Sequence, residues 1–384
     1  MNSDIRLIGY GQTRFGELWD MGIRDLMEEA ADAAISSAPI TALDIDMIIV
    51  SNMLAEITNG QAHLSAIASS LLPHHPPALR VESACGSGAF ALHTACAMLE
   101  SGRARNVLVI GAEKMTDVSN DIVSSALMGA ADAEQERPAG LTFPGIFGMI
   151  AQRYMHEYGL SRAALSLVSA VHHRNACGNS FAQFRTEVTP DDVSGSAPVA
   201  DPLRLLDCSP ISDGAAACVL STDKESPVRI AASQIASDSL SIVDRPVLTS
   251  FSATKDAAER SLAEAEVKLK DIRIVETHDC FSIAALINLE DLGFADPGGG
   301  IRFYRNAYEG QTAAHRSPGE GGALGVNMSG GLKGCGHPVG ATGIKQIIDV
   351  AKRLRETGER YGLAHNFGGA CATCGVHVLE HSPS

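Results

Sequence analysis

The chain carries the same order of predicted elements twice. Each copy is expected to contain a strand, a helix and a second strand, then a glycine-rich turn leading into another helix, and finally two strands. The first copy comprises residues 5–10, 26–34, 45–50, 81–88, a helix to about 99, 106–111 and 215–220. The second comprises residues 228–232, 257–265, 272–276, 334–340, a helix to about 354, 361–365 and 373–379. Because a repeated order indicates duplicated structure, we expect two similar halves that pack together.

Strands that alternate with helices favour an α/β fold, with mixed or parallel sheets covered by helices. We expect residues 1–227 to form the first half and residues 228–384 the second. Residues 116–210 have no counterpart in the second half, and prolines and polar turns interrupt their helical pattern. We interpret this stretch as a loop domain that is inserted in the first half and lies over it, covering a substrate site. A surface excursion or a subunit contact is the alternative.

Charge and cysteine content exclude several classes of protein. The chain has 30 Lys and Arg against 45 Asp and Glu, a formal net charge of −15, which argues against binding to nucleic acid or to anionic membranes. The nine cysteines are an odd number, scattered and mostly inside apolar runs, as in a cytoplasmic protein with reduced thiols. No apolar run reaches about 18 residues and the start does not resemble a signal peptide, so we expect neither a membrane span nor secretion.

Cys85 lies where a strand-like run ends and a helix rich in small residues begins. At the N-terminus of a helix, free backbone N–H groups and the helix dipole favour a thiolate, the form in which cysteine is a nucleophile. Gly86 and Gly88 would let another group approach the backbone closely. The local sequence also fits a buried cysteine that packs as a small hydrophobic residue.

His337 occupies the matching glycine-rich turn of the second half, between Gly336 and Pro338. If the two halves pack about a pseudo-twofold axis, the two turns meet and His337 lies near Cys85. A constrained turn fixes the position of a general base, and a base beside a cysteine activates the nucleophile. The alternative is a histidine that caps the following helix.

His278 and Cys280 follow the predicted strand at residues 272–276 and precede an apolar helix. Strand ends of this kind gather at one edge of an α/β sheet, where binding crevices form. The two side chains would supply a hydrogen-bond donor and a second titratable thiol. Alternatively, Asp279 caps the helix and Cys280 packs in the core.

Cys371 and Cys374 have a spacing that some metal sites share. They lie in an apolar run that we predict to be a central strand, where residues three apart point to opposite faces. No second cysteine pair accompanies them at metal-site spacing. We therefore expect them to pack in the core, and we expect no metal site.

Three segments together resemble the thiolases. Residues 81–88, the run GGLKGCGHPVGATG at 330–343 and the run HNFGG at 365–369 stand in thiolase order and spacing, and the resemblance extends essentially end to end. It implies the thiolase fold, two βαβαβαββ halves with a loop domain. The motif HDCF at 278–281 is similar to that of sterol-carrier-protein-type thiolases and, more closely, of archaeal acetoacetyl-CoA thiolases and their bacterial relatives.

The resemblance implies roles for the candidate residues. Cys85 accepts the acyl group, while His337 activates Cys85 and then helps to bind the thioester oxygen. One oxyanion hole uses the backbone N–H groups of Cys85 and Gly368. The other uses His337 with a water held by His278.

The substrate pocket is expected to contain Asn366 and Phe147. Ordinary biosynthetic thiolases have a second catalytic cysteine where this chain has Asn366, so the acid/base thiol is expected at Cys280 instead. A bulky ring at Phe147 favours short acyl groups. The alternative for Phe147 is packing inside the loop domain.

The sequence thus predicts a CoA-dependent C-acyltransferase that performs a Claisen condensation of two acyl-CoA molecules or the reverse thiolysis. Coenzyme A thioesters are the substrates, and no metal or redox cofactor is expected. Two alternatives remain: a decarboxylating enzyme of the ketoacyl-synthase type, and a CoA-binding scaffold subunit without catalysis. The resemblance implies a homodimer or homotetramer, and archaeal relatives work beside a hydroxymethylglutaryl-CoA synthase and a small OB-fold protein.

Overall fold

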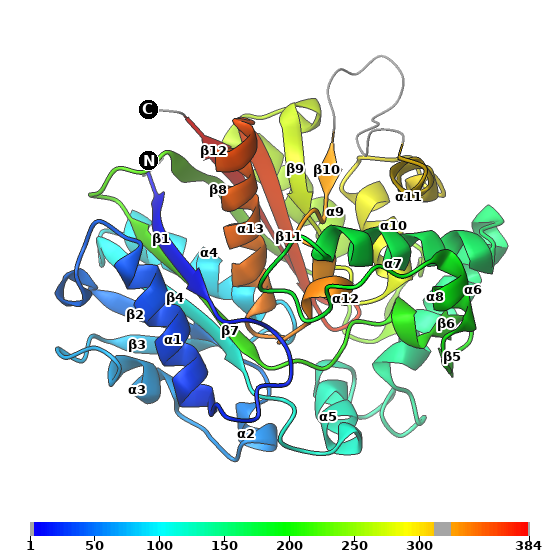
Figure 1. Ribbon diagram of the computed structural model, residues 1–384, viewed down its shortest axis with the longest axis horizontal. Coiled ribbons are helices and arrows are strands. Elements are labelled where there is room, and N and C mark those ends of the chain that lie inside the picture. Colours follow the sequence, from blue (N-terminus) through cyan, green and yellow to red (C-terminus); the bar gives the residue numbers. More distant parts are fainter. Residues whose placement is uncertain (1–3, 311–323, 383–384) are drawn as a thin grey trace.

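The structure is a computed structural model that describes residues 4–310 and 324–382. The expectation that the chain starts without a signal peptide concerns a segment whose first three residues lie outside the described residues. Ten strands of the described residues form one mixed sheet in the order β10-β9-β11-β12-β8-β1-β7-β4-β2-β3 (Figure 1). The first half contributes β1 (Arg6–Gln12), β2 (Met47–Ser51), β3 (Ala78–Val81), β4 (Asn106–Glu113) and β7 (Gly214–Ser221). The second contributes β8 (Val228–Ser237), β9 (Ile272–Glu276), β10 (Gly325–Val326), β11 (Tyr361–Gly368) and β12 (Thr373–His381).

The order of the strands is the same in both directions from the contact between β1 and β8. In each half the two pairs nearest that contact are antiparallel and the two outer pairs are parallel. β1 and β8 themselves meet antiparallel at Arg6 and Arg229. The structure therefore confirms the duplicated α/β fold that the repeat predicted.

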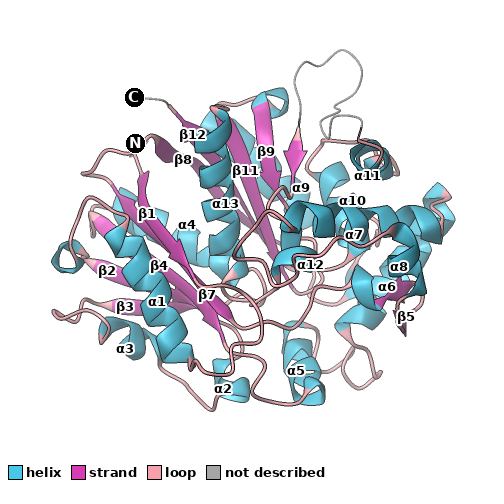
Figure 2. Cartoon of the chain, in the orientation of Figure 1, coloured by secondary structure: helices cyan, strands magenta, loops and turns pink. Residues whose placement is uncertain are grey.

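The helices follow the same repeat (Figure 2). Those of the first half are α1 (Ile23–Ser36), α2 (Ala55–Thr58), α3 (Leu64–Ser69) and α4 (Ser87–Glu100). Those of the second half are α9 (Ser252–Ala265), α10 (Ser282–Asp291), α11 (Gly300–Tyr308), α12 (Gly331–Cys335) and α13 (Thr342–Thr357). Single 3₁₀ turns lie at Ala42–Asp44, Met128–Ala130, Leu205–Asp207, Ile242–Asp244 and Leu269–Asp271.

Helices α4 and α13 cross near their N-termini, and each contacts strands of both halves. Gly88 and Gly343 are the second residues of these helices. A Cβ built on Gly88 would lie 2.8 Å from the backbone nitrogen of Gly343, and one on Gly343 would lie 2.5 Å from the nitrogen of Ala89. Glycine at both positions permits this approach of the two backbones. The crossing brings together the two turns that precede α4 and α13.

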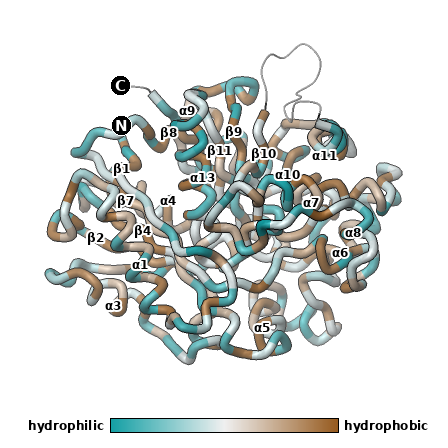
Figure 3. Tube along the Cα trace, viewed as in Figure 1, coloured by the Kyte–Doolittle hydropathy of each residue, from teal (hydrophilic) through white to brown (hydrophobic). Residues whose placement is uncertain are grey.

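The outer helices differ in how much of their surface is buried. Helix α1 contains both hydrophilic and hydrophobic residues (Figure 3), and its buried residues pack on the first-half sheet. In contrast, all ten residues of α10 are buried. A helix that is buried all round needs apolar neighbours on every side.

The loop domain comprises α5 (Asn120–Leu127), α6 (Phe143–Tyr158), α7 (Arg162–Ala176), α8 (Pro190–Gly195), β5 (Pro198–Ala200) and β6 (Leu203–Arg204). Its helix α5 packs on the first half, as expected, beside Leu54, whereas α6 and α7 pack on the second half, which was not expected. Ile146 and Leu165 belong to one core cluster with Ile283 and Leu286 of α10. Helix α7 contacts α10 and α11, and α6 contacts α10 (Figure 1). The physical reason is that α10 needs an apolar cover, which the loop domain supplies.

Across residues 4–310 and 324–382, none of the helices combines the length and the apolar content that a membrane crossing requires.

Candidate active site

Cys85 lies in a tight turn between β3 and α4. Ala84 has a left-handed backbone with φ of 51°, which turns the chain before the helix. The hydroxyl of Ser87 accepts the N–H of Ser83 at 2.8 Å and donates to the carbonyl of Ala84 at 2.6 Å. The side chain of Cys85 is partly exposed. It also packs against the apolar cluster that includes Leu54, which removes much of the water from the sulfur.

The free site keeps Cys85 as a thiol. Removal of water raises the pKa of Cys85 to about 12, against a hydrogen bond from the backbone of Gly369 that lowers it. The charge of Glu113 raises the pKa further. Desolvation therefore opposes the thiolate that the N-terminus of α4 was expected to favour. Cys85 needs a base at the moment of attack.

His337 lies in the turn before α13. Its backbone N–H donates to the hydroxyl of Ser212 at 3.0 Å. Its Nδ1 lies 2.7 Å from the hydroxyl oxygen of Thr342, and that hydroxyl donates to the carbonyl of Pro338 at 3.1 Å. With the hydroxyl proton of Thr342 on this carbonyl, Nδ1–H of His337 donates to Thr342, and Nε2 carries the lone pair that a general base requires.

The free nitrogen of His337 can accept a proton. Its Nε2 is buried without a hydrogen-bond partner among the described residues. Burial lowers the pKa of His337 to about 4, so the ring is neutral near pH 7. The N-cap of α13 is Ala341, with no side-chain cap, so the ring of His337 does not act as the helix cap of the alternative interpretation.

The ring of His278, which follows β9, lies against that of His337. The two ring centroids are 4.9 Å apart and the planes meet at 84°. The carbonyl of His278 accepts the side-chain amide of Asn288 at 2.7 Å, and Nδ1 lies 2.9 Å from Nδ2 of Asn366. Burial and the neighbouring histidines lower the pKa of His278 well below its usual value, so this ring is also neutral. Its Nε2 has no partner among the described residues either.

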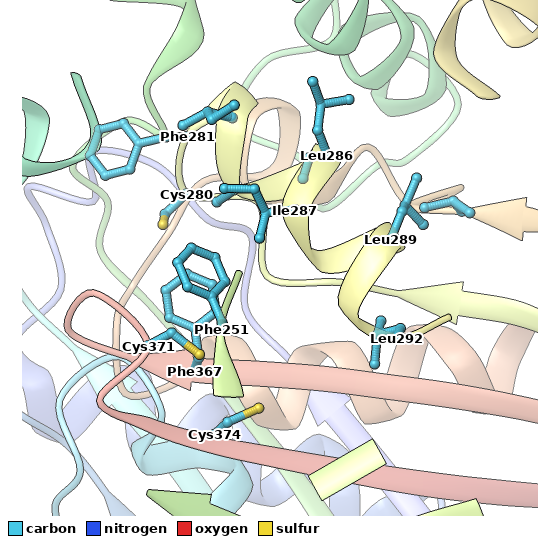
Figure 4. Close-up of a cluster of buried hydrophobic side chains, with 14 of the residues drawn as sticks. Phe251, Cys280, Phe281, Leu286, Ile287, Leu289, Leu292, Phe367, Cys371 and Cys374 are labelled. Atoms are coloured by element: carbon cyan, nitrogen blue, oxygen red, sulfur yellow. The ribbon is translucent and has the colours of Figure 1, made fainter. Parts of the chain in front are cut away.

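Cys280 stands at the start of α10 and is buried (Figure 4). Its carbonyl accepts the backbone N–H of Ser209 at 2.8 Å. Burial raises the pKa of Cys280 well above its usual value, and Cys85 raises it further. The second half therefore brings a protonated thiol within electrostatic reach of Cys85.

Asp279 does not cap α10, whereas Cys280 does belong to the core cluster, so the alternative interpretation holds in part. The carboxylate of Asp279 accepts the backbone N–H of Leu332 at 2.8 Å and pairs with Lys333 at 3.3 Å and with His172 at 2.7 Å. The pairing outweighs burial and holds the pKa of Asp279 well below its usual range. This buried cluster ties the segment between β9 and α10 to α12 and to α7 of the loop domain.

Phe147 packs beside the segment that carries Cys280. Its ring stacks on that of Phe281 at 4.5 Å between centroids and lies 6.3 Å from that of Phe367. Both partners belong to the second half, so Phe147 is not confined to the loop domain. Gly368 packs against the turn of Cys85, where an added Cβ would lie 2.2 Å from the carbonyl oxygen of Ser83.

Cys371 and Cys374 lie on the same side of the backbone. Cys371 precedes β12 in a turn with φ of 65°, and the hydroxyl of Thr254 lies 3.3 Å from its sulfur and 3.7 Å from that of Cys374. The expectation that the two sulfurs point to opposite faces is therefore wrong, because the strand begins only at Thr373. Both side chains are buried in the core, as expected (Figure 4). The described residues contain no group of three or more His, Cys, Asp or Glu that could hold a metal ion.

Three contributors to the site were not predicted from the sequence. Gly369 donates a backbone hydrogen bond to Cys85, Thr342 orients His337, and Lys333 neutralises Asp279. A lysine inside a run of small and apolar residues was a usable signal for a buried ion pair. No local pattern marks the other two, because their roles depend on contacts made in the folded chain.

The chain is similar to known proteins over nearly its full length. Residues 5–224 match the family model described as thiolase, N-terminal domain, and residues 235–381 match thiolase C-terminal domain-like. An acetyl-CoA acetyltransferase from Methanothermobacter thermautotrophicus is 42% identical, over 98% of this chain and 99% of that protein. Sterol carrier protein 2 from Homo sapiens is 30% identical, over 94% of this chain and 69% of that protein. The solved structure of an Ltp2-ChsH2(DUF35) aldolase is 23% identical, with a TM-score of 0.81 over 99% of this chain and 98% of that chain.

Proposed function

Because this chain belongs to the thiolase family, we propose that it is a C-acyltransferase acting on acyl-CoA thioesters. It condenses two acetyl-CoA molecules to acetoacetyl-CoA or runs the reverse thiolysis, as the name of its 42% identical relative suggests. One observation supports the assignment of the site: the rings of His278 and His337 lie 4.9 Å apart, and the two thiols Cys85 and Cys280 lie within electrostatic reach of each other. Both thiols are protonated and both rings are neutral.

The first half-reaction loads Cys85. The lone pair on Nε2 of His337 takes the thiol proton as the sulfur attacks the thioester carbonyl. The C–S bond to coenzyme A then breaks, and the departing thiolate takes a proton from Cys280. Acyl-Cys85, an imidazolium at His337 and a thiolate at Cys280 remain. The imidazolium offsets the charge of the buried thiolate.

The second half-reaction uses that thiolate. Cys280 removes a proton from the α-carbon of a second acyl-CoA, and the carbanion attacks the acyl group on Cys85. The bond between the acyl carbon and the sulfur of Cys85 breaks. His337 returns its proton to the sulfur, so every group regains its starting state. The cycle is balanced in protons and needs no metal or redox cofactor.

Charge develops on oxygen in both half-reactions, and preorganised donors stabilise it. For the tetrahedral intermediate we propose the backbone N–H groups of Cys85 and Gly368. The close packing of Gly368 on the turn of Cys85 supports this pairing. For the enolate we propose His337 with His278 and its water, which fits the two ring nitrogens that lack protein partners.

Short acyl groups are the proposed substrates. Phe147 is fully buried and stacks on Phe281, next to Cys280 in the chain. A ring at this place would close the acyl end of the pocket, together with Asn366. Acetoacetyl-CoA should therefore be cleaved faster than long-chain 3-ketoacyl-CoAs.

We propose that the protein acts in the cytoplasm as a homodimer or homotetramer. The edge strand β3 is available for a subunit contact, since Leu79 is 41% exposed there. A hydroxymethylglutaryl-CoA synthase and a small OB-fold protein are candidate partners by the family resemblance. One solved structure of similar fold is named as an Ltp2-ChsH2(DUF35) aldolase, and that name joins two components.

Mass spectrometry of the intact protein after incubation with acetyl-CoA tests the proposal. One added acetyl group is expected, on the peptide that contains Cys85, together with release of acetyl-CoA from acetoacetyl-CoA and coenzyme A. The Cys85→Ala variant should lose both. Cys335→Ala is the matched control, because Cys335 lies in the glycine-rich turn of the second half but is buried against the carbonyl of Ser329. Undiminished labelling of Cys85→Ala would refute the mechanism.

A further inference from the structure

The side-chain amide of Asn366 has only one orientation in this fold. Its Oδ1 accepts the backbone N–H of Ala89 at 3.4 Å. Ala89 lies in the first turn of α4, where backbone N–H groups have no partner inside the helix. A backbone N–H can only donate, so the amide atom that faces it is the oxygen. The NH₂ group of Asn366 must therefore point the other way.

The NH₂ group of Asn366 points at the ring of His278. Its Nδ2 lies 2.9 Å from Nδ1 of His278. Because an amide NH₂ can only donate, Nδ1 of the neutral ring must carry the lone pair, and the proton must be on Nε2. That Nε2 is buried and has no partner among the described residues, so its N–H is available to a ligand.

The two facing imidazoles therefore have opposite tautomers. Thr342 leaves His337 with a lone pair on Nε2, whereas Asn366 leaves His278 with a proton there. The two rings lie 4.9 Å apart, and Nε2 of His337 is a proton acceptor whereas Nε2 of His278 is a hydrogen-bond donor. Each partner acts through the ring nitrogen that faces away from the site.

We propose that Asn366 is a positioning residue, which holds His278 as the Nε2–H tautomer so that it donates a hydrogen bond toward the enolate oxygen. The inference rests on the proposed function for what His278 contacts. It adds a specific requirement: position 366 must present a donor to the ring. It also changes the role of Asn366, from a residue that lines the pocket to one that acts through a histidine.

The Asn366→Asp variant tests this requirement with little change in shape. One carboxylate oxygen can still accept the N–H of Ala89. The other accepts a hydrogen bond from Nδ1–H of His278, so the ring carries its lone pair on Nε2 and no longer donates there. The α-proton exchange of acetyl-CoA and the kcat of thiolysis should fall about 10²–10³-fold, as for loss of one oxyanion donor. KM and the acylation of Cys85 should change far less.

The tautomer is read directly, and not from activity, by ¹⁵N NMR of histidine-labelled protein. His278→Gln identifies the signal among the 13 histidines. Wild type should show Nδ1 unprotonated and Nε2 protonated, and Asn366→Asp should show the reverse. Asn366→Leu, which presents neither donor nor acceptor, should show both tautomers and an intermediate rate. It serves as the test if the aspartate variant does not fold.

Asn288→Asp is the matched control. It makes the same change at an equally buried asparagine, which bonds the carbonyl of His278 and not its ring. It should leave the tautomer unchanged. If that protein does not fold, the second control is Thr254→Val, which removes a hydroxyl 3.0 Å from Nε2 of His365 and not from His278. A His278 that keeps its Nε2 proton in both Asn366 variants, or one that inverts without loss of exchange, overturns the inference. Wild-type protein that forms no acyl-Cys85 would instead overturn the proposed function, whatever the tautomer.

Discussion

The two halves of this molecule share one topology, yet they contribute unequally to the candidate site. The first half supplies Cys85 from the turn before α4. The second supplies His337 from the turn before α13, and also His278 and Cys280 from the end of β9. At the corresponding end of β2, the side-chain amide of Asn52 donates a hydrogen bond to Glu113 of the same half at 2.8 Å. Duplication thus fixes where site residues can stand, while the side chains decide which half performs which step.

The halves also differ in what covers them. The first-half sheet carries α1 on its outer face and ends at the exposed edge strand β3. In the second half, α10 and Cys280 share one core cluster with the loop domain. The loop domain therefore removes water from the second-half thiol, which is the main reason that the pKa of Cys280 is raised. The comparison predicts a division of labour between a partly exposed nucleophile and an enclosed acid/base.

The sharpest test of that division is Cys280→Ser. A hydroxyl keeps the shape but has a pKa far above that of a thiol near 8.5, so proton transfer should fail. We expect α-proton exchange and condensation to fall about 10²–10⁴-fold, while acyl-Cys85 still forms. Exchange of deuterium at the α-carbon of acetyl-CoA, measured beside acyl-enzyme formation, separates the two. Wild-type exchange in the variant would make Cys280 a core residue, and His278 would then be the first candidate for the acid/base.

His337→Ala tests the opposite side of the comparison, because this second-half residue is needed for the first-half nucleophile. Acylation of Cys85 should slow about 10²–10³-fold through loss of the base and a donor. Rapid-quench measurement of acyl-enzyme formation gives the rate. His93→Ala is a suitable control, since His93 lies on α4 and bonds the carbonyl of Ser233 at 2.9 Å. Acylation at the wild-type rate in His337→Ala would mean that another group takes the thiol proton.

Gly88→Ala tests whether the crossing of α4 and α13 is what joins the halves. Its Cβ would meet only backbone atoms of the opposite helix, at 2.8–3.0 Å, so the helices must shift. We expect the free energy of unfolding in urea to fall by about 1–3 kcal/mol. Gly195→Ala is the control, because nothing lies within 4 Å of a Cβ there. Equal stability of the two variants would show that the crossing tolerates a methyl group.

The smallest expected effect is that of pH on acylation. The pKa of His337 is lowered to about 4, so the base stays neutral at pH 5.5, where a histidine of ordinary pKa near 6.5 would be about 90% protonated. Acylation at pH 5.5 should stay within about twofold of that at pH 7.5. As the pH falls, the histidines of the unfolded chain are protonated before these buried rings are. The free energy of unfolding therefore decreases between about pH 6.5 and 4, and circular dichroism must confirm that the protein is still folded. A tenfold fall in rate with the fold intact would contradict a lowered pKa.

The sequence predicted the elements of both halves because their signals are local. Apolar spacing, strand-like runs and glycine-rich turns reflect the contacts of neighbouring residues, so β9 was located at residues 272–276 as observed. The turn of Cys371 was missed because its left-handed φ is not evident from an apolar run. The contact of α6 and α7 with the second half was missed, because an apolar helix such as α10 shows that it needs a cover but not which segment provides it.

What the sequence determined by itself is the duplicated order of strands and helices and the chemical types at four positions of the candidate site. Only the tertiary structure decided their states. Burial, which sums contributions from many distant residues, keeps Cys85 and Cys280 as thiols and both histidines neutral. Hydrogen bonds of Thr342 and Asn366 to the two rings then set which ring nitrogen carries the proton, and Ala89 of the first half orients Asn366.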